Sequence, residues 1–126
     1  MNTHLVVGTV LAVIYVAVSV GVLTIARKSR NGTLPRNPLV GVRTRETLGD
    51  DSSWRAGQRE ARRRYVRLVP VLAGAAIASL VNALAEGPFW GFAVIAAVSG
   101  ALDLAIVTSS AAAANSAARR ERHRPV

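Results

Sequence analysis

Three long runs of uncharged residues alternate with segments that carry nearly all the charge. The first run, residues 5–26, contains 22 residues without a charged side chain. A helix of that length extends about 33 Å, against roughly 30 Å of hydrocarbon in a bilayer. The second run, residues 68–85, has 18 residues, which is near the short end of the spanning range. The third begins near residue 89, and Asp103 is its only charged residue before Arg119.

This distribution predicts an all-α membrane protein with three transmembrane helices. Spans at about residues 5–26, 68–85 and 89–112 leave a polar loop at 27–67 and a basic C-terminal tail at 113–126. A soluble domain would instead spread its apolar residues along the chain at a helical or strand period. A single membrane domain over residues 1–126 is therefore the expected organisation.

A cleaved signal peptide is the alternative interpretation of the first run. Signal peptides begin with basic residues and have a shorter apolar region followed by a small-residue cleavage site. Residues 1–4 contain no Lys or Arg, and the apolar run is longer than such a region. The pattern favours a membrane span.

Charge placement predicts the orientation of the spans. The net charge is +9, with 16 Lys and Arg against 7 Asp and Glu. All the basic residues lie in residues 27–67 and 119–124, so none precedes the first span or separates the second and third. Because Lys and Arg favour the cytoplasmic side, we expect the N-terminus outside, the C-terminus inside and a cytoplasmic loop at 27–67. This placement favours contact with anionic lipid headgroups and argues against nucleic-acid binding.

The cytoplasmic loop is predicted to be ordered and to carry an amphipathic helix. Asp51 or Ser52 is a suitable N-cap after the turn-forming Gly49. From there on, helical periodicity gathers five side chains on one face: Trp54, Gln58, Ala61, Tyr65 and Leu68. Arginines cover the rest of the helix. A helix with this pattern fits the inner membrane interface.

Few residues in the chain can support catalysis. There is no cysteine, and the two histidines, His4 and His123, lie near opposite ends. No His, Cys, Asp and Glu cluster has the spacing of metal ligands, and no glycine-rich phosphate loop follows a strand. We therefore expect no enzyme activity, no bound metal and no cofactor.

Three polar residues inside the spans are candidate functional residues. Asp103 is the one ionisable residue within a span, and such residues face a protein interior and mark function. Ser19 lies at a matching depth in the first span and is a candidate partner, as are Arg43 and Arg67. Asn82 is expected to make helix–helix hydrogen bonds. Alternatively, Asp103 lies near the inner boundary and is merely solvated.

Small residues predict where the second and third spans meet. Four alanines recur at four-residue spacing in the third span: Ala93, Ala97, Ala101 and Ala105. Small residues let helix backbones approach closely in lipid, where apolar surface alone drives no association. We expect this ladder to form the contact with residues 68–85.

One polar stretch combines turn-forming residues, arginines, hydroxyl groups and a single tryptophan. It is NPLVGVRTRETLGDDSSWRAGQ, residues 37–58. Asn37 and Gly41 indicate a constrained backbone. Arg43, Thr44 and Thr47 bring a guanidinium and two hydroxyls together, a set that suits a phosphate or a carboxylate. The alternative is a solvated basic loop without a ligand.

The pattern Asn37-x-x-x-Gly41-x-Arg43-Thr44-x-x-Thr47, followed by Trp54, resembles the signature of the SdpI family of small bacterial integral membrane proteins. Family members carry this segment in a cytoplasmic loop, and their Trp opens a helix with a His one turn later. Gln58 occupies that position here, and Gln does not titrate. The resemblance implies immunity to a membrane-active peptide toxin at the bacterial cytoplasmic membrane, with a signalling role in some members.

An accessory or structural subunit of a larger membrane transport or envelope complex is the alternative function. A small chain with three spans and small-residue faces suits such a role. The expected partners are the lipid bilayer and either a peptide toxin or a larger membrane complex. Self-association into a homo-oligomer is left open by the sequence.

Overall fold

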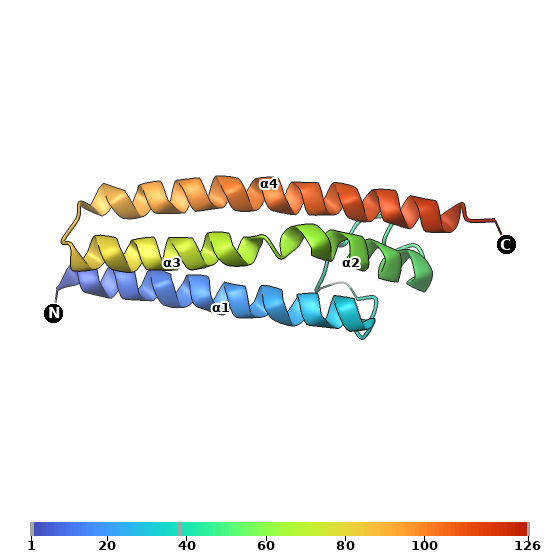
Figure 1. Cartoon of the computed structure of the whole chain (residues 1–126), viewed down its shortest axis with the longest axis horizontal. Coiled ribbons are helices and arrows are strands. Elements are labelled where there is room, and N and C mark those ends of the chain that lie inside the picture. Colours follow the sequence, from blue (N-terminus) through green and yellow to red (C-terminus); the bar gives the residue numbers. More distant parts are fainter. Residues whose placement is uncertain (1, 38, 126) are drawn as a thin grey trace. The chain divides into compact units, whose positions relative to one another are not determined.

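The computed structural model describes residues 2–37 and 39–125, and these residues form helices, turns and loops without a strand. Pro38, within the polar stretch, lies outside the described residues. Four helices follow one another along the chain (Figure 1): α1 (Thr3–Asn31), α2 (Asp51–Tyr65), α3 (Leu68–Leu84) and α4 (Phe89–Arg122).

Three helical stretches are long and apolar enough to cross a membrane, which confirms the predicted three-span class. α1 and α4 meet this criterion singly, and Asp51–Leu84 meets it as one stretch that includes α2 and α3. Both long helices continue beyond the expected spans, α1 to Asn31 and α4 to Arg122. The expected basic tail is therefore helical over most of its length.

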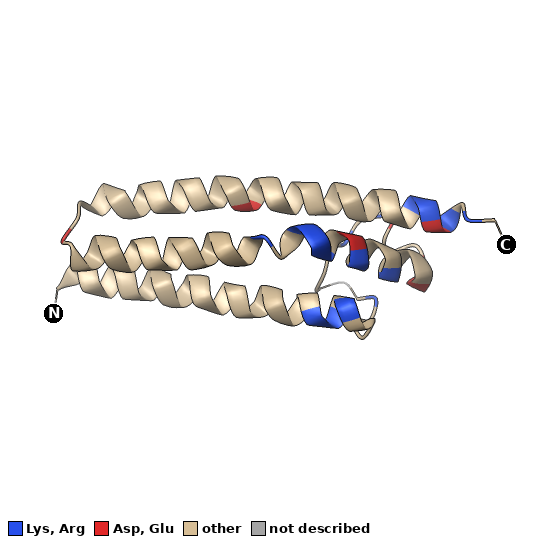
Figure 2. Cartoon of the chain, in the orientation of Figure 1, with Lys and Arg blue, Asp and Glu red and all other residues tan. Residues whose placement is uncertain are grey.

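The chain divides into two compact units, each built from two segments. The apolar unit comprises Met1–Val22 and Leu68–Leu104, and the basic unit comprises Leu23–Arg67 and Ala105–Val126. Every Lys and Arg belongs to the basic unit, where Figure 2 shows them on α2 and on the last turns of α1 and α4. The apolar unit contains only Glu86 and Asp103 among the acidic residues.

Small side chains bring α1 and α3 together in the apolar unit. The buried residues of α3 lie on one helical face: Leu72, Ala75, Ala76, Ser79 and Ala83. At Gly8 of α1, an added Cβ would contact the Cβ of Ala83 and lie 2.9 Å from the carbonyl oxygen of Ser79. The two backbones approach as closely as small residues allow, which is how helices associate in lipid.

The predicted alanine ladder is not the packed face of α4. Ala93, Ala97, Ala101 and Ala105 are all exposed, whereas Phe92 and Ser99 are buried in the apolar unit. The ring of Phe92 reaches the space beside Gly8, where an added Cβ would lie 3.6 Å from its Cε1. A large ring opposite a glycine fills the interface better than alanine opposite alanine, and this sets the rotation of α4.

Asn82 stabilises the connection between α3 and α4. Its backbone carbonyl accepts a hydrogen bond from the Gly87 amide at 2.8 Å. Its side-chain amide donates to the Pro88 carbonyl at 3.4 Å. Glu86 in this turn has a φ of 50°. The hydrogen bonds of Asn82 in this structure are therefore made to the turn.

The N-cap of α2 lies one residue earlier in the chain than the sequence predicted. Asp50 is the N-cap, and its side chain accepts a hydrogen bond from the Ser53 amide. Asp50 takes this role, in place of Asp51 or Ser52, because its extended backbone points its carboxylate at the first turn. The buried residues of α2 include four of the five predicted to share a face: Trp54, Gln58, Ala61 and Tyr65. The fifth, Leu68, is half-buried and begins α3, because α2 ends at Tyr65.

The buried face of α2 contacts the chain itself. The Tyr65 hydroxyl donates to Ser29 Oγ at 3.1 Å, and Arg62 Nε donates to the Ala26 carbonyl at 3.1 Å. Ser29 and Ala26 belong to the last turns of α1. The end of α1, the loop that follows it and α2 therefore pack together within the basic unit.

Candidate functional site

The motif loop, residues 33–50, begins with a bend built by Asn37. Its Oδ1 accepts hydrogen bonds from the amides of Leu39 at 2.9 Å and Val40 at 2.7 Å. Its Nδ2 donates to the carbonyls of Pro35 at 2.7 Å and Val40 at 3.2 Å. Asn is suited to such local backbone bonding because its short amide both donates and accepts. Asn37 therefore fixes the conformation of the loop.

The side-chain amide of Gln58 forms two hydrogen bonds with the backbone of Val42, one in each direction. The Val42 amide donates to Gln58 Oε1 at 3.0 Å, and Gln58 Nε2 donates to the Val42 carbonyl at 2.7 Å. The Gln58 side chain is 2 % exposed. Buried polar groups need partners, and this pair satisfies a donor and an acceptor on each side. Gln58 joins the middle of the motif loop to α2.

Gly41 allows the loop to approach α2 closely. Its φ of 96° lies in the left-handed region that disfavours other residues. An added Cβ would lie 2.8 Å from Gln58 Oε1 and 3.2 Å from both Trp54 and Leu34. Gln58 cannot move aside without losing its bonds to the backbone. Both the conformation and the space at this position therefore require glycine.

Replacing Gly41 with alanine should destabilise the basic unit by about 1–3 kcal/mol, because backbone strain and overpacking add. Gly32→Ala is the matched control, since Gly32 also has a positive φ, of 68°, but nothing within 4 Å of an added Cβ. The free energy of local opening from hydrogen exchange measures both variants. Equal losses in the two variants would show that the close approach at Gly41 contributes nothing.

Trp54 fills the space between α2 and the start of the motif loop. It is the largest fully buried side chain among the described residues, with 1 % of its surface exposed. Its indole Nε1 donates to the Leu34 carbonyl at 3.0 Å. Because Leu34 is also buried, this bond supplies a donor to a buried carbonyl that lies beyond the end of α1. Trp54 thus anchors the first end of the loop, as Gln58 anchors its middle.

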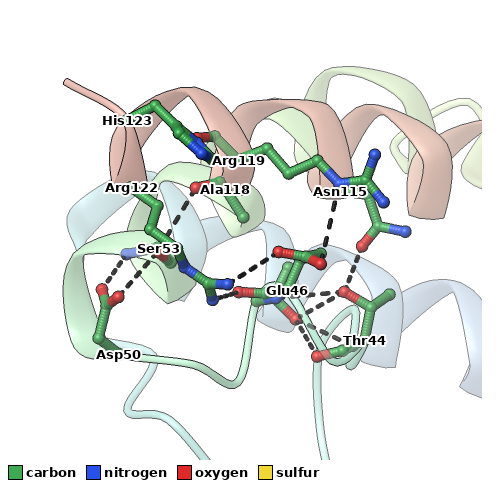
Figure 3. A network of polar contacts seen from close by, with 10 residues as sticks. Thr44, Glu46, Asp50, Ser53, Asn115, Ala118, Arg119, Arg122 and His123 are labelled. Carbon is green, nitrogen blue, oxygen red and sulfur yellow. Dashed lines mark hydrogen bonds and ion pairs between the residues drawn. The ribbon is translucent and has the colours of Figure 1, made fainter.

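The two motif threonines are occupied inside the loop. Thr47 is fully buried; its Oγ1 accepts from the Thr44 amide at 2.9 Å and lies 3.1 Å from the Val42 carbonyl oxygen. The Thr44 hydroxyl donates to the Asn115 side-chain oxygen of α4 (Figure 3). These hydroxyls serve the structure of the loop and its contact with α4. They are not turned toward an external ligand.

Ion pairs join the motif loop to the last turns of α4. Arg122 Nη1 lies 3.0 Å from Glu46 Oε2, and Arg119 Nε lies 3.8 Å from Glu46 Oε1. Arg122 also donates to the Glu46 carbonyl at 3.2 Å, and its guanidinium covers Gly49. Figure 3 shows Arg122 between Glu46 and Asp50. Single exposed ion pairs contribute about 0–1 kcal/mol, but this shared set fixes the second half of the loop on α4.

Hydrogen bonds hold the pKa of the Asp50 carboxyl at about 2, below its usual 3.8. The largest cause is the hydrogen bond from the Ser53 backbone amide, followed by the bond from the Ser52 hydroxyl, and the positive charge of Arg122 adds to them. All three favour the ionised form. The ionised Asp50 carboxylate is therefore the form that caps α2 more strongly.

This lowered pKa predicts a loss of stability in acid. Because the folded pKa lies below the unfolded value, the carboxylate stabilises the fold above about pH 4, and this contribution disappears as the pH falls toward about 2. Asp50→Asn keeps a capping oxygen without the titration. We expect the thermal stability of the wild type to fall more steeply than that of Asp50→Asn between pH 4 and pH 2. Parallel pH curves would contradict this assignment.

Arg43 differs from the other motif residues because its side chain is exposed. Asn37, Gly41, Thr44, Thr47, Trp54 and Gln58 are buried or half-buried. Among these motif residues, Arg43 is therefore the one on the surface of the loop. An external partner of the motif would meet Arg43 first.

The polar residues of the spans are brought to one level but not into a bonded pair. The Tyr15 hydroxyl lies 3.5 Å from Ser99 Oγ in the apolar unit, and Ser19 and Asp103 each lie one helical turn further along the same two helices. Ser19 Oγ donates to the Tyr15 carbonyl at 2.9 Å. Asp103 Oδ1 is buried and has no hydrogen-bond partner among the described residues. The depth match fits the expectation, whereas the expected Ser19–Asp103 bond is not found.

Sequence reasoning missed the residues that hold the loop from outside the motif. Glu46, Asn115 and Arg122 form contacts between segments more than 70 residues apart. One signal was present: Glu46 is the only acidic residue between residues 27 and 49, within a region crowded with arginine. An isolated acid beside so many basic residues indicates a specific ion-pair partner.

The fold and the loop define a helical, three-span membrane protein whose central polar loop is bonded to two of its helices. The model of the SdpI/YfhL protein family matches residues 33–108. This match covers more than half of the chain, and the chain belongs to the SdpI/YfhL family. Comparisons with curated proteins and with solved structures found no match. Asn115, Arg119 and Arg122 lie beyond the matched residues.

Proposed function

We propose that this SdpI-family protein protects a bacterial cell from a membrane-active peptide toxin. The observation that carries the proposal is the family match, which includes the whole motif loop. The protein would lie in the cytoplasmic membrane with its N-terminus outside and its C-terminus inside, because all its Lys and Arg gather in the basic unit. Protection by binding requires none of the catalytic clusters that the sequence lacks.

The division of labour within the motif supports recognition through exposed side chains. Asn37, Thr47 and Gln58 use their polar groups to hold the loop. Arg43 is exposed on that fixed loop, and a guanidinium recognises carboxylate and phosphate groups. In the apolar unit, Asp103 Oδ1 has no partner and is a second candidate contact for a ligand or partner helix.

Survival under membrane-active peptides tests the proposal. Cells that express the protein should survive concentrations that kill a deletion strain. Arg43→Ala should reduce protection, whereas Arg45→Ala, which removes the same charge from a neighbouring exposed arginine, should not. Asp103→Ala should insert into the membrane normally and protect less. Identical survival of deleted and expressing strains under every peptide would refute immunity.

The proposed orientation is testable because the chain contains no cysteine. Single-cysteine variants at Glu86, between α3 and α4, and at Thr33, after α1, can be labelled with a membrane-impermeant maleimide. We expect Glu86→Cys to react in intact cells and Thr33→Cys to react only after permeabilisation. The reverse labelling pattern would invert the topology.

Purification in mild detergent separates immunity from the accessory-subunit function. Recovery of the tagged protein alone or as a homo-oligomer is expected for an autonomous immunity protein. If a larger membrane protein is recovered in stoichiometric amount, the accessory-subunit function is favoured and autonomous immunity is refuted. A signalling role would require a soluble partner that is recovered by the wild type and lost with Arg43→Ala.

A further inference from the structure

A polar pocket of about 290 Å³ opens in the basic unit beside the start of α2. Two arginines, Arg36 and Arg55, line it together with Asp51, Trp54 and Gly32. Ligand pockets range from about 300 to 1,000 Å³, so this one matches a small group and not a whole nucleotide or lipid.

Arg36 is held in place at the wall of the pocket. Its Nε lies 3.3 Å from Asp51 Oδ1, and its Nη1 donates to the Leu48 carbonyl at 3.3 Å. A guanidinium has five N–H donors in a planar fork, so donors on Nη2 remain for another group. The Arg36 side chain is thereby held in one orientation while some of its N–H donors stay available.

Arg55 supplies a second guanidinium that is not engaged elsewhere. It is exposed and forms no hydrogen bond or ion pair with any described residue. It is the fifth residue of α2 and lies just after the first helical turn. With Arg36 and Asp51, the charged side chains of the pocket sum to one positive charge. The pocket therefore favours an anion.

We propose that this pocket binds an anionic phosphate group between Arg36 and Arg55. Phosphate has enough oxygens to accept from two guanidiniums at once, in the geometry that arginine forks match. The space at Gly32 is open, because an added Cβ there would meet no atom within 4 Å. The bulk attached to a phosphodiester can leave the pocket on that side.

The proposed phosphate site is distinct from the set of Arg43, Thr44 and Thr47. The two threonine hydroxyls are committed to the loop and to Asn115, whereas Arg55 is available. The phosphate can come from free inorganic phosphate or from the headgroup of an anionic lipid. The site does not depend on the immunity function and can be tested without a toxin.

Trp54 provides a direct readout of the pocket in the full-length protein. Trp90 is the only other tryptophan and is exposed in the apolar unit, so Trp90→Phe leaves Trp54 as the single indole fluorophore. The purified protein is titrated with inorganic phosphate, with acetate, and with phosphatidylglycerol vesicles against phosphatidylcholine vesicles. We expect a saturable change in Trp54 emission with phosphate, with phosphatidylglycerol, or with both.

Arg55→Gln should weaken this binding about tenfold or more, which is the loss expected when hydrogen bonds to a charged group are removed. Arg59→Gln is the matched control, because Arg59 is exposed one turn further along α2 and does not line the pocket. Arg55→Lys keeps the charge without the fork and should fall between the wild type and Arg55→Gln.

The titrations distinguish the two sources of the phosphate group, and they also show whether the site has been assigned to the wrong residues. Saturation by inorganic phosphate indicates a free anion, and saturation by phosphatidylglycerol alone indicates a lipid headgroup. Equal weakening by Arg55→Gln and Arg59→Gln would overturn the site, because diffuse charge attraction predicts that result. An equal response to acetate, or no response to either phosphate source, would also overturn it.

Discussion

Trp54→Ala should lower the free energy of unfolding of the basic unit by about 3–5 kcal/mol, the usual loss for a buried aromatic residue. Trp54 is 1 % exposed, and its Nε1 is bonded to the Leu34 carbonyl. Alanine would leave a cavity between the loop and α2 and a buried carbonyl without its donor. Hydrogen exchange over residues 33–50 should rise toward the rate of an unstructured chain.

Two control variants separate the contributions of Trp54. Trp54→Phe keeps most of the ring and removes the bond to Leu34, so we expect a loss nearer to 1 kcal/mol. Trp90→Ala makes the same replacement at a residue that is 68 % exposed and should change stability by less than about 0.5 kcal/mol. If Trp54→Ala and Trp90→Ala behave alike, Trp54 does not anchor the loop.

Gln58→Leu should lower the stability of the same unit by about 2–4 kcal/mol. Leucine has a similar size, but it leaves the Val42 amide without its acceptor and removes one of the two donors to the Val42 carbonyl, the other being the Thr47 hydroxyl. An unsatisfied buried polar group costs about 1–3 kcal/mol. The Val42 amide should therefore lose most of its protection from hydrogen exchange.

Substitutions of the same size distinguish pairing from packing at Gln58. Gln58→Glu retains an acceptor for the Val42 amide but places a second oxygen against the Val42 carbonyl. Gln58→His, which introduces the residue implied by the family resemblance, can satisfy one of the two groups because its ring nitrogens point in diverging directions. We expect the stability order Gln, His, then Glu and Leu. Wild-type protection in Gln58→Glu would contradict the bidentate pair.

The sequence predicted the features that depend on local pattern. The lengths of the uncharged runs predicted three helices able to cross a membrane, and the structure has them. Helical periodicity grouped Trp54, Gln58, Ala61 and Tyr65 with Leu68, and all but Leu68 are buried on α2. Local pattern is sufficient here because a helix repeats every 3.6 residues, whatever it packs against.

The contacts between distant segments were beyond sequence reasoning. Spacing showed that Ala93 and Ala97 share a face, but the fit of Phe92 beside Gly8 determined which face of α4 is packed. Likewise, Arg122 and Glu46 are 76 residues apart, and no local pattern pairs them. A basic tail is equally compatible with lipid headgroups and with a buried loop.

The structure also gives different roles to motif residues that the sequence had grouped together as one candidate binding set. Thr44 and Thr47 were expected to offer hydroxyls to a ligand, but their bonds are internal. Residue type alone does not say whether a hydroxyl faces inward or outward. Arg43 is exposed on the loop that the other motif residues hold, and this exposure is why the proposed function assigns recognition to its guanidinium.

The most direct test of the ordered motif loop is hydrogen exchange of the wild-type protein in lipid nanodiscs. Three amides report on it, because they are bonded within the loop or to α2: Val42, Thr44 and Leu48. We expect these amides to exchange at least about a hundredfold more slowly than in an unstructured chain, as a local opening free energy near 3 kcal/mol requires. Exchange at the unstructured rate throughout residues 33–50 would contradict a loop built by its own motif.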